Sequence, residues 1–276
     1  MRPDLSVGFG SYVSYPGMRL SVWMKIPTLI HEQNLTPGKA TQWLAPHVER
    51  VAVSFDDTFE ELSQGKRAVT GLPLRSDLRS SFAGKHPKPV KTAAERFRIL
   101  IVGGSQGASR INQLILDAFL QFSPEELKKI AVKHITGTSD LRKITEAYQK
   151  MNIQAETFAF HNRMQEIYGE TDLAITRAGA NTLSELSLFG VPAMVIPYPF
   201  AGAHQIDNAR FFENRKAVIV AEEETIDAAW MAQKIREMMN SPESLSLLSK
   251  NIQTLSCVDA DEQLVKLAED LLKGRN

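Results

Sequence analysis

The 276-residue sequence predicts an α/β protein built from two halves, each with its own parallel sheet. Short apolar runs alternate with longer segments of helical periodicity, which is the pattern of repeated βαβ units. Runs such as RILIVGG (98–104) and PAMVIPY (192–198) are apolar on successive residues, as strands covered by helices on both faces are. A polar, irregular stretch between residues 75 and 96, with Pro87 and Pro89, separates the two halves.

The individual elements follow from the same patterns. The predicted strands are residues 5–7, 28–30, 51–54, 68–70, 98–102, 131–135, 156–158, 173–176, 193–196 and 217–220. The clearest helical segments are residues 108–122, 140–151, 181–189 and 205–214, and residues 226–273 are helical in pattern almost throughout. We therefore expect an N-terminal domain over residues 1–84 and a C-terminal domain over residues 96–257. A final helix, about 258–276, is expected to pack back onto the first domain.

Composition excludes several classes of protein. Lys and Arg number 32, as do Asp and Glu, so the formal net charge is zero and nothing favours nucleic-acid binding. Cys257 is the single cysteine, so no intramolecular disulfide forms, and a reducing cytosol is the expected compartment. Pro192, Pro197 and Pro199 interrupt the longest apolar runs, so no transmembrane segment is expected.

A glycine-rich turn follows the first strand of the second half, in LIVGGSQGASRIN (100–112). Glycines let the backbone approach a ligand, and the free N–H groups of the following helix suit a phosphate. The turn contains Gly103, Gly104, Ser105, Gln106 and Gly107. An ordinary strand-to-helix turn also favours glycine, so this motif alone favours phosphate only modestly.

A second junction of this kind is AITRAGANTLSEL (174–186). It places Arg177 before a helix whose first turns carry Asn181, Thr182, Ser184 and Glu185. Asn181 or Thr182 alone would serve as a helix cap, and that is the alternative explanation. The surplus of an arginine, hydroxyls and a carboxylate favours an anionic ligand with a polyhydroxylated neighbour, and carboxylates commonly accept ribose hydroxyls.

The segment PYPFAGAHQIDNARFF (197–212) follows the next strand, and His204, Gln205 and Asn208 are spaced to share a helical face. Alone they are more simply a solvated helix face, but at the carboxyl edge of the same sheet they become candidate sugar ligands.

The first half carries polar loops at its own strand ends. LIHEQNLTPGKA (29–40) puts four polar side chains, His31 to Asn34, directly after a buried strand, where they are costly unless bonded or binding. GFGSYVSYPGM (8–18) is a glycine loop that contains Gly10, Ser11, Tyr12 and Ser14. GLPLR (71–75) ends the half with Arg75, which is either a linker charge or a residue that reaches a diphosphate.

The DAD sequence at Asp259–Asp261 resembles the Asp-x-Asp motif of metal-dependent glycosyltransferases. It lies at the start of the final helix, where acidic residues suit the helix dipole, and this explains it better. We therefore expect no metal and no cofactor.

Together, HEQN, GGSQGA, RAGANTLSE and HQIDNA resemble the MurG family in order and spacing. The resemblance runs from Asp4 to about Asn214 and continues weakly to the C-terminus. It implies a GT-B architecture, in which two Rossmann-like domains face a cleft, with the N-terminal domain incomplete here.

The family's activity is inverting, metal-independent transfer of N-acetylglucosamine from UDP-N-acetylglucosamine (UDP-GlcNAc). The acceptor is the MurNAc 4-hydroxyl of undecaprenyl-pyrophosphoryl-MurNAc-pentapeptide (lipid I), and the product is lipid II for peptidoglycan synthesis. The resemblance implies a peripheral protein on the cytoplasmic face of the bacterial inner membrane, in contact with the membrane surface. Trp23 matches an aromatic position of the family's membrane-facing patch, although an ordinary half-buried helix residue explains it equally well.

The resemblance also implies roles for the residues of each motif. The Gly103–Gly107 backbone with Gly104, Ser105 and Gln106 would hold the donor diphosphate, assisted by Arg75, and Glu185 would take the ribose hydroxyls. Ala180, Asn181, Thr182, Leu183 and Ser184 would line the phosphate and sugar. Asn34, Gln205 and Asn208 would contact the sugar, His161 would lie near the uracil, and Gly10, Ser11, Tyr12 and Ser14 would form the acceptor-side loop.

One family motif, the G-G-T-G-G-H loop with the histidine usually proposed as general base, is absent from this chain. We therefore leave the catalytic residue unknown and expect a further segment to precede the matched region. The alternative function is a truncated, catalytically inactive UDP-sugar-binding remnant or fragment. HEQN together with GGSQGA argues against a third reading, a UDP-sugar epimerase.

Overall fold

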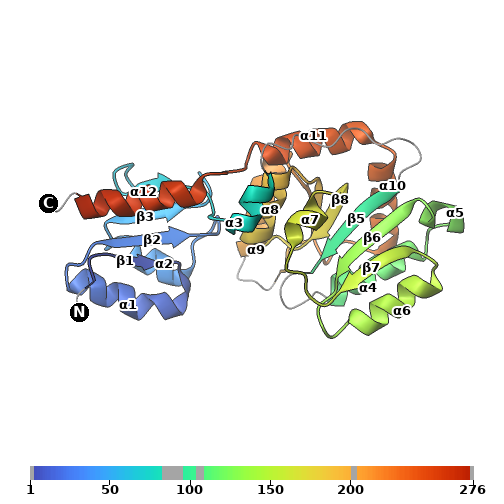
Figure 1. The fold of residues 1–276 in the computed structure, drawn as a ribbon, viewed down its shortest axis with the longest axis horizontal. Coiled ribbons are helices and arrows are strands. Elements are labelled where there is room, and N and C mark those ends of the chain that lie inside the picture. Colours follow the sequence, from blue (N-terminus) through green and yellow to red (C-terminus); the bar gives the residue numbers. More distant parts are fainter. Residues whose placement is uncertain (1–2, 83–95, 104–108, 200–203, 274–276) are drawn as a thin grey trace.

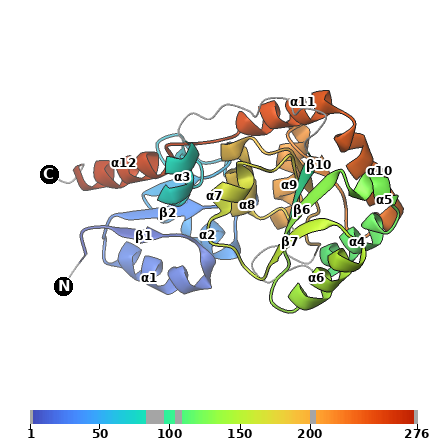
Figure 2. The same cartoon turned by 45° about the vertical axis from the view of Figure 1, so that its right-hand side comes forward.

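Two parallel sheets, each covered by helices, form the computed structural model of the chain (Figures 1 and 2). The structure describes residues 3–82, 96–103, 109–199 and 204–273. Each sheet belongs to one half of the chain, so the predicted α/β class with parallel sheets is confirmed.

The first sheet has the order β1-β2-β3-β4, with all pairs parallel. Its strands are β1 (Ser6–Gly8), β2 (Thr28–Glu32), β3 (Arg50–Val53) and β4 (Arg67–Val69). On one face, helices α1 (Ser11–Trp23) and α2 (Lys39–Leu44) bury Met18 and Leu44 against Ile30 and Val51. On the opposite face lies α12 (Ala260–Lys273), the last helix of the chain (Figure 1).

The second sheet has the order β10-β9-β8-β5-β6-β7, again parallel throughout. Its strands are β5 (Phe97–Val102), β6 (Ile130–Ile135), β7 (Gln154–Phe158), β8 (Leu173–Thr176), β9 (Ala193–Val195) and β10 (Ile219–Val220). The helices of this half are α4 (Ser109–Phe119), α5 (Pro124–Leu127), α6 (Leu141–Lys150), α7 (Met164–Tyr168), α8 (Ala180–Phe189), α9 (His204–Asn214), α10 (Ala228–Met239) and α11 (Pro242–Gln253).

The continuous apolar character of the central strands is explained by this layering. In β5, Ile99 and Ile101 pack with residues of α4, α6 and α10, whereas Leu100 and Val102 pack with residues of α7, α8, α9 and α11. Every position of β5 from Ile99 to Val102 is therefore buried, and an alternating pattern would leave one helical layer without a partner.

The short helix α3 (Ser76–Phe82) lies between the two halves in sequence but packs against the second half. Its Leu78 is buried with residues of α7 and α8, and Phe82 contacts the ring of Phe189. Most of the predicted linker, residues 83–95, lies outside the described residues, so the domain boundaries stay a prediction. Arg79 pairs with Asp261 at the start of α12.

Two chain segments connect the halves, one after β4 and one before α12, and they contact each other at Gly71 and Cys257. The thiol of Cys257 donates to the carbonyl of Thr70 across 3.0 Å, and Gly71 has a φ of 74°. A Cβ added at Gly71 would lie 2.3 Å from the Cβ of Cys257, so only glycine fits here.

Candidate active site

Most of the predicted site residues that the structure describes lie where the carboxyl ends of the central strands meet the first turns of α8 and α9. In the second sheet, β5 is flanked by β6 on one side and β8 on the other, so the direction of chain progression reverses there. Ligands of open α/β sheets bind outside the carboxyl ends at such a point. Arg177 and Ala180 follow β8, and His204 to Asn208 form the start of α9.

Helix α8 begins without the side-chain cap that was the alternative explanation for its polar first turn. Gly179 occupies the N-cap position, and no side chain caps the helix. Asn181, which is exposed, and Thr182, which is half-buried, lie inside the first turn. The helix therefore presents uncapped N–H groups at the carboxyl edge of the sheet, where a bound anion is favoured.

Glu185 lies one turn further into α8, and it forms a hydrogen bond with a buried tyrosine. The hydroxyl of Tyr168 donates to Oε2 of Glu185 across 2.6 Å. Burial raises the pKa of the Glu185 carboxyl, and the Tyr168 hydrogen bond and the nearby Arg75 partly offset this effect. Tyr168 therefore fixes one carboxylate oxygen and leaves the other for a ligand hydroxyl.

Arg75 and His161 lie at the same end of the site. The Arg75 guanidinium donates to the carbonyl of Asn162 across 2.8 Å and pairs with Asp77 at 3.2 Å. The ring of His161 packs on Phe158 with centroids 4.8 Å apart, and its Nε2 is buried without a hydrogen-bond partner among the described residues. Arg75 thus ties the first half to the segment after β7, and His161 offers an unused polar atom there.

Arg177 is held inside the protein by a carboxylate that the sequence did not suggest. It forms a buried ion pair with Glu223, which follows β10, and donates to the carbonyls of Ile196 and Pro197. Arg110 in the first turn of α4 also pairs with Glu223, at 3.2 Å. The structure therefore gives Arg177 a positioning role among three loops at the carboxyl edge, and its contact with a donor phosphate stays a prediction.

The start of α9 lies against the polar loop that follows β2, so residues from both halves come together. Nδ2 of Asn208 donates to Oδ1 of Asn34 across 3.2 Å and to the carbonyl of Ala178 across 3.2 Å. The backbone N–H of Leu35 donates to Oδ1 of Asn208 across 2.9 Å. Asn208 is fully buried and has internal partners for both ends of its amide, so it binds a sugar only by exchanging one of them.

Gln205 and His204 differ from Asn208 in having part of the side chain available. Oε1 of Gln205 accepts from the N–H of Tyr198 across 2.9 Å, which turns the amide toward the end of β9. Nδ1 of His204 donates to the carbonyl of Thr36 across 2.9 Å. The predicted common face therefore holds for His204 and Asn208, whereas Gln205 points back to the second sheet.

The four polar residues after β2 have distinct roles. The buried Glu32 carboxylate accepts from the backbone N–H groups of Asn34 and Gly38 across 3.0 and 3.1 Å, so it shapes the loop. His31 donates from Nε2 to the carbonyl of Gly71 across 2.9 Å, and its Nδ1 lies 3.1 Å from Nε2 of Gln33. Burial lowers the pKa of His31. The first three residues thus stabilise the loop that carries Asn34.

The predicted acceptor-side loop, Gly10 to Ser14, lies beside the loop after β2. Gly10 has a φ of 74° and precedes α1, and an added Cβ would lie 3.7 Å from Oε1 of Gln33. The Ser14 hydroxyl donates to the carbonyl of Gly10 across 2.5 Å, so it supports the turn, whereas Tyr12 is 85% exposed.

Three of the predicted phosphate ligands, Gly104, Ser105 and Gln106, lie outside the described residues.

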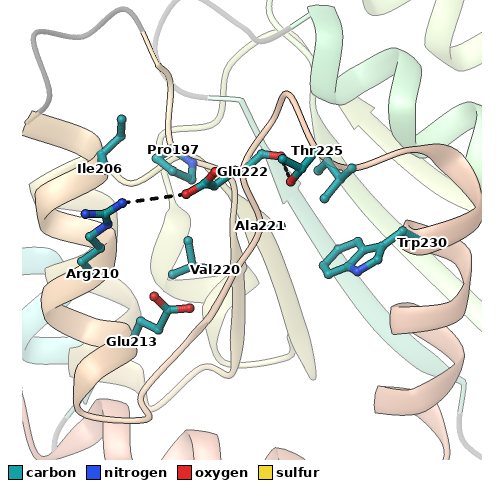
Figure 3. A pocket seen from close by; sticks show the side chains of 10 residues that line it. Pro197, Ile206, Arg210, Glu213, Val220, Ala221, Glu222, Thr225 and Trp230 are labelled. Carbon is teal, nitrogen blue, oxygen red and sulfur yellow. Dashed lines mark hydrogen bonds and ion pairs between the residues drawn. The ribbon is translucent and has the colours of Figure 1, made fainter.

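An open pocket of about 290 Å³ lies on another face of α9, between that helix, the loop after β10 and α10 (Figure 3). Ile206, Arg210 and Glu213 line it with Trp230, and it contains none of the predicted site residues.

No group of three or more His, Cys, Asp and Glu side chains is arranged to hold a metal ion within the described part of the chain. Of the acidic residues that resemble a metal motif, Asp259 accepts from Gln263 across 3.0 Å and Asp261 pairs with Arg79.

Several residues of the site were not identified from the sequence. Tyr168 and Glu223 carry no local signal, because their partners lie in distant segments. Thr36 and Asp207 contact each other across the halves, and both lie inside or beside motifs that the sequence did single out. Their positions next to Asn34 and Asn208 were the available clue.

Comparison with known families gives matches in both halves. The model of the glycosyltransferase family 28 C-terminal domain matches residues 98–264, and that of the family 28 N-terminal domain matches residues 1–53.

Curated relatives match over nearly the whole chain. A UDP-N-acetylglucosamine–N-acetylmuramyl-(pentapeptide) pyrophosphoryl-undecaprenol N-acetylglucosamine transferase from Geobacter metallireducens is 35% identical over 265 residues, which cover 96% of this chain and 72% of that protein. The protein of the same name from Pseudomonas syringae is 33% identical over 280 residues, covering 99% and 75%.

Among solved structures, MurG from Acinetobacter baumannii superposes with a TM-score of 0.80 and 28% identity, covering 97% of this chain and 74% of that one. A putative UDP-N-acetylglucosamine 2-epimerase from Listeria monocytogenes gives a TM-score of 0.70 at 9% identity, covering 95% and 73%, and so shares the fold alone.

Proposed function

This chain belongs to the MurG family of glycosyltransferases, and we propose that it transfers N-acetylglucosamine from UDP-GlcNAc to the MurNAc 4-hydroxyl of lipid I, giving lipid II. The observation that carries the proposal is the convergence of Glu185, the uncapped start of α8 and Asn34 of the other half on one edge of the second sheet.

The nucleoside is proposed to bind at the end of the site that contains Glu185, Arg75 and His161. The free carboxylate oxygen of Glu185 would accept the ribose hydroxyls, because Tyr168 already occupies the other oxygen. His161, whose Nε2 has no partner among the described residues, is proposed to lie near the uracil. Arg75 would contribute positive charge toward the diphosphate while keeping its contact with the segment after β7.

The diphosphate and sugar are proposed to lie along the first turn of α8, over Ala180 to Ser184. The free N–H groups of that turn stabilise the negative charge that develops on the UDP leaving group, and this stabilisation needs no metal. Gln205 would present its amide Nε2 to a sugar hydroxyl, and Asn34 would approach from the other half.

Inversion defines the bonds that change. The MurNAc 4-hydroxyl oxygen forms a bond to the anomeric carbon on the face opposite UDP, while the bond from that carbon to the diphosphate oxygen breaks. The hydroxyl proton leaves to a base, and UDP departs with the bonding electron pair. The residues singled out above act by holding the donor and by stabilising the departing diphosphate.

Association with a membrane surface is proposed to occur through α1. Tyr12, Leu20 and Trp23 follow helical spacing along α1 and are all more than half exposed. Trp43 of α2, also exposed, contacts Tyr15 edge-to-face at 5.9 Å and extends the same apolar surface. Such a patch of aromatic and aliphatic side chains suits the headgroup boundary of a bilayer. Within the described residues, no helix is both long and apolar enough to cross a membrane.

The test is a transfer assay with the full chain, UDP-GlcNAc labelled in the sugar, and lipid I dispersed in detergent. The expected result is label in the lipid product with a β-linkage, at a rate unchanged by a divalent-metal chelator. Label that appears only as free sugar, or as an epimerised nucleotide sugar, would contradict the proposal.

A further inference from the structure

The loop Asn34–Thr36 of the first half is joined to the first turns of α9 by four hydrogen bonds. Two involve Asn208, which bonds the side chain of Asn34 and the backbone of Leu35. The other two involve Thr36, whose hydroxyl donates to Oδ2 of Asp207 across 2.5 Å and whose carbonyl accepts from Nδ1 of His204 across 2.9 Å. We call these six residues the clasp.

The hydrogen bond between Thr36 and Asp207 is expected to be a strong one. Asp207 lies in the first turn of α9, where the helix dipole favours a carboxylate, and a hydrogen bond to a charged acceptor is stronger than a neutral one. Thr36 is held by both its hydroxyl and its carbonyl, so the loop is fixed in orientation as well as position.

Further contacts between the first half and α9 lie toward the far end of the helix, and they come from the segment after β3. The ring of Phe55 packs on Phe211 with centroids 4.8 Å apart, and Arg215 pairs with Asp56 and Asp57 at 3.1 Å. The first half therefore contacts α9 at both ends of the helix, and removing one bond of the clasp would loosen the sugar-proximal end without separating the halves.

We propose that Thr36 and Asp207 are positioning residues of the donor-sugar site, which hold the first half against α9 so that Asn34 is presented to the sugar. This inference rests on the proposed function, because it assigns Asn34 the sugar contact. Neither Thr36 nor Asp207 needs to touch the ligand. Their effect is confined to the part of the donor that lies between the halves, since the nucleoside end is formed by Glu185 and its neighbours on the other side of the site.

The test compares the affinities for UDP and for UDP-GlcNAc in Thr36→Val, Thr36→Ser and Asp207→Ala. The expected result is UDP binding within twofold of the parent in all three variants. UDP-GlcNAc binding should weaken about tenfold in Thr36→Val and Asp207→Ala, as loss of one charge-assisted hydrogen bond predicts. Thr36→Ser keeps the hydroxyl and should bind like the parent. Glu213→Gln, on the pocket face of the same helix (Figure 3), is the matched control and should change neither affinity.

Equal weakening for UDP and UDP-GlcNAc, or no weakening for either, would overturn the positioning role. A second measurement needs no ligand: amide hydrogen exchange at Leu35, whose N–H donates to Asn208, should be faster in the double variant Thr36→Val/Asp207→Ala than in the parent. Unchanged exchange at Leu35 would overturn the clasp. A parent chain that binds no UDP-GlcNAc would count against the proposed function, and the exchange comparison would still decide the clasp.

Discussion

Tyr168, which is buried in the core with residues of α3 and α8, donates a 2.6 Å hydrogen bond to the half-buried Glu185. This hydrogen bond orients the Glu185 carboxylate at the end of the site that is assigned to the nucleoside. Burial raises the pKa of that carboxyl group. A partly desolvated carboxylate with one oxygen already fixed accepts a ribose hydroxyl with little further reorganisation. The same desolvation also lowers the stability of the unliganded protein.

Replacing Glu185 with Gln is therefore predicted to stabilise the free protein at neutral pH. A raised folded-state pKa means that the folded state binds the proton more tightly, so stability falls as pH rises from the ordinary glutamate pKa through the raised one. Above that window the parent is destabilised and Glu185→Gln is not. Urea unfolding at pH 7 and pH 4 should show a stability advantage for the variant that shrinks at pH 4. An advantage of equal size at both pH values would contradict this explanation.

The buried His134 predicts a different dependence on pH. Its Nε2 donates to Oδ1 of Asn112 across 2.9 Å, and its Nδ1 accepts from the Tyr148 hydroxyl across 2.9 Å, because the Asn112 amide nitrogen already donates to Thr136 and Asp140. Burial lowers the pKa of His134 to about 3, so the ring stays neutral in the folded state.

Between pH 6.5 and 3 the unfolded state takes up a proton at His134 that the folded state does not, so stability falls as the pH falls. His134→Phe should be less stable than the parent by roughly 2 kcal/mol at pH 7, because Tyr148 and Asn112 lose partners. Its further loss between pH 7 and pH 5 should be smaller than that of the parent. Parallel losses in the two proteins would exclude His134 as the source of the acid sensitivity.

Arg177 and Glu223 form a pair in which each side chain is about 90% buried, at 9% and 10% exposure. Arg177→Met is predicted to cost about 3–5 kcal/mol, because it leaves a desolvated carboxylate whose one remaining charged partner among the described residues is Arg110. The double variant Arg177→Met/Glu223→Met should recover part of this loss. Thermal and urea unfolding of the single and double variants measure the coupling, and simple additivity of the two single losses would argue against the pair as a unit.

The exposed surface of α1 predicts binding to lipid vesicles. Trp23→Ser should reduce sedimentation with anionic phospholipid vesicles several-fold, because the indole is 79% exposed and suits the bilayer interface. Leu247→Ser removes an apolar side chain that is 55% exposed on α11 in the other half and serves as the control. Equal effects of the two substitutions would point to general apolar contact instead of a site on α1.

The fold was predictable because its signals are local. The apolar runs and their lengths located all ten described strands to within two residues at every boundary, and continuous apolar character correctly indicated helices on both faces. The close contact between Gly71 and Cys257 was not predictable, because the two residues lie 186 positions apart in the sequence.

The candidate site was predictable in outline but not in its internal pairing. His31 to Asn34 were expected to be hydrogen-bonded or to bind a ligand, and Glu32 and His31 do hold the loop that carries Asn34. Sequence spacing could not reveal that the Asn208 amide forms hydrogen bonds with Asn34, Leu35 and Ala178. Nor could it reveal that Arg177 forms an ion pair with Glu223. In each case the polar group has a partner from another part of the chain, and a single sequence contains no record of that pairing.

The most direct test of the proposed site is a calorimetric titration of the parent and Glu185→Ala with UDP and with its 2′,3′-dideoxy analogue. The substitution is predicted to weaken UDP binding about tenfold or more, as loss of a charged acceptor for ribose hydroxyls requires. It should cause no further weakening for the analogue that lacks those hydroxyls. Equal UDP affinity in the parent and in Glu185→Ala would show that the nucleotide does not bind at this edge of the sheet.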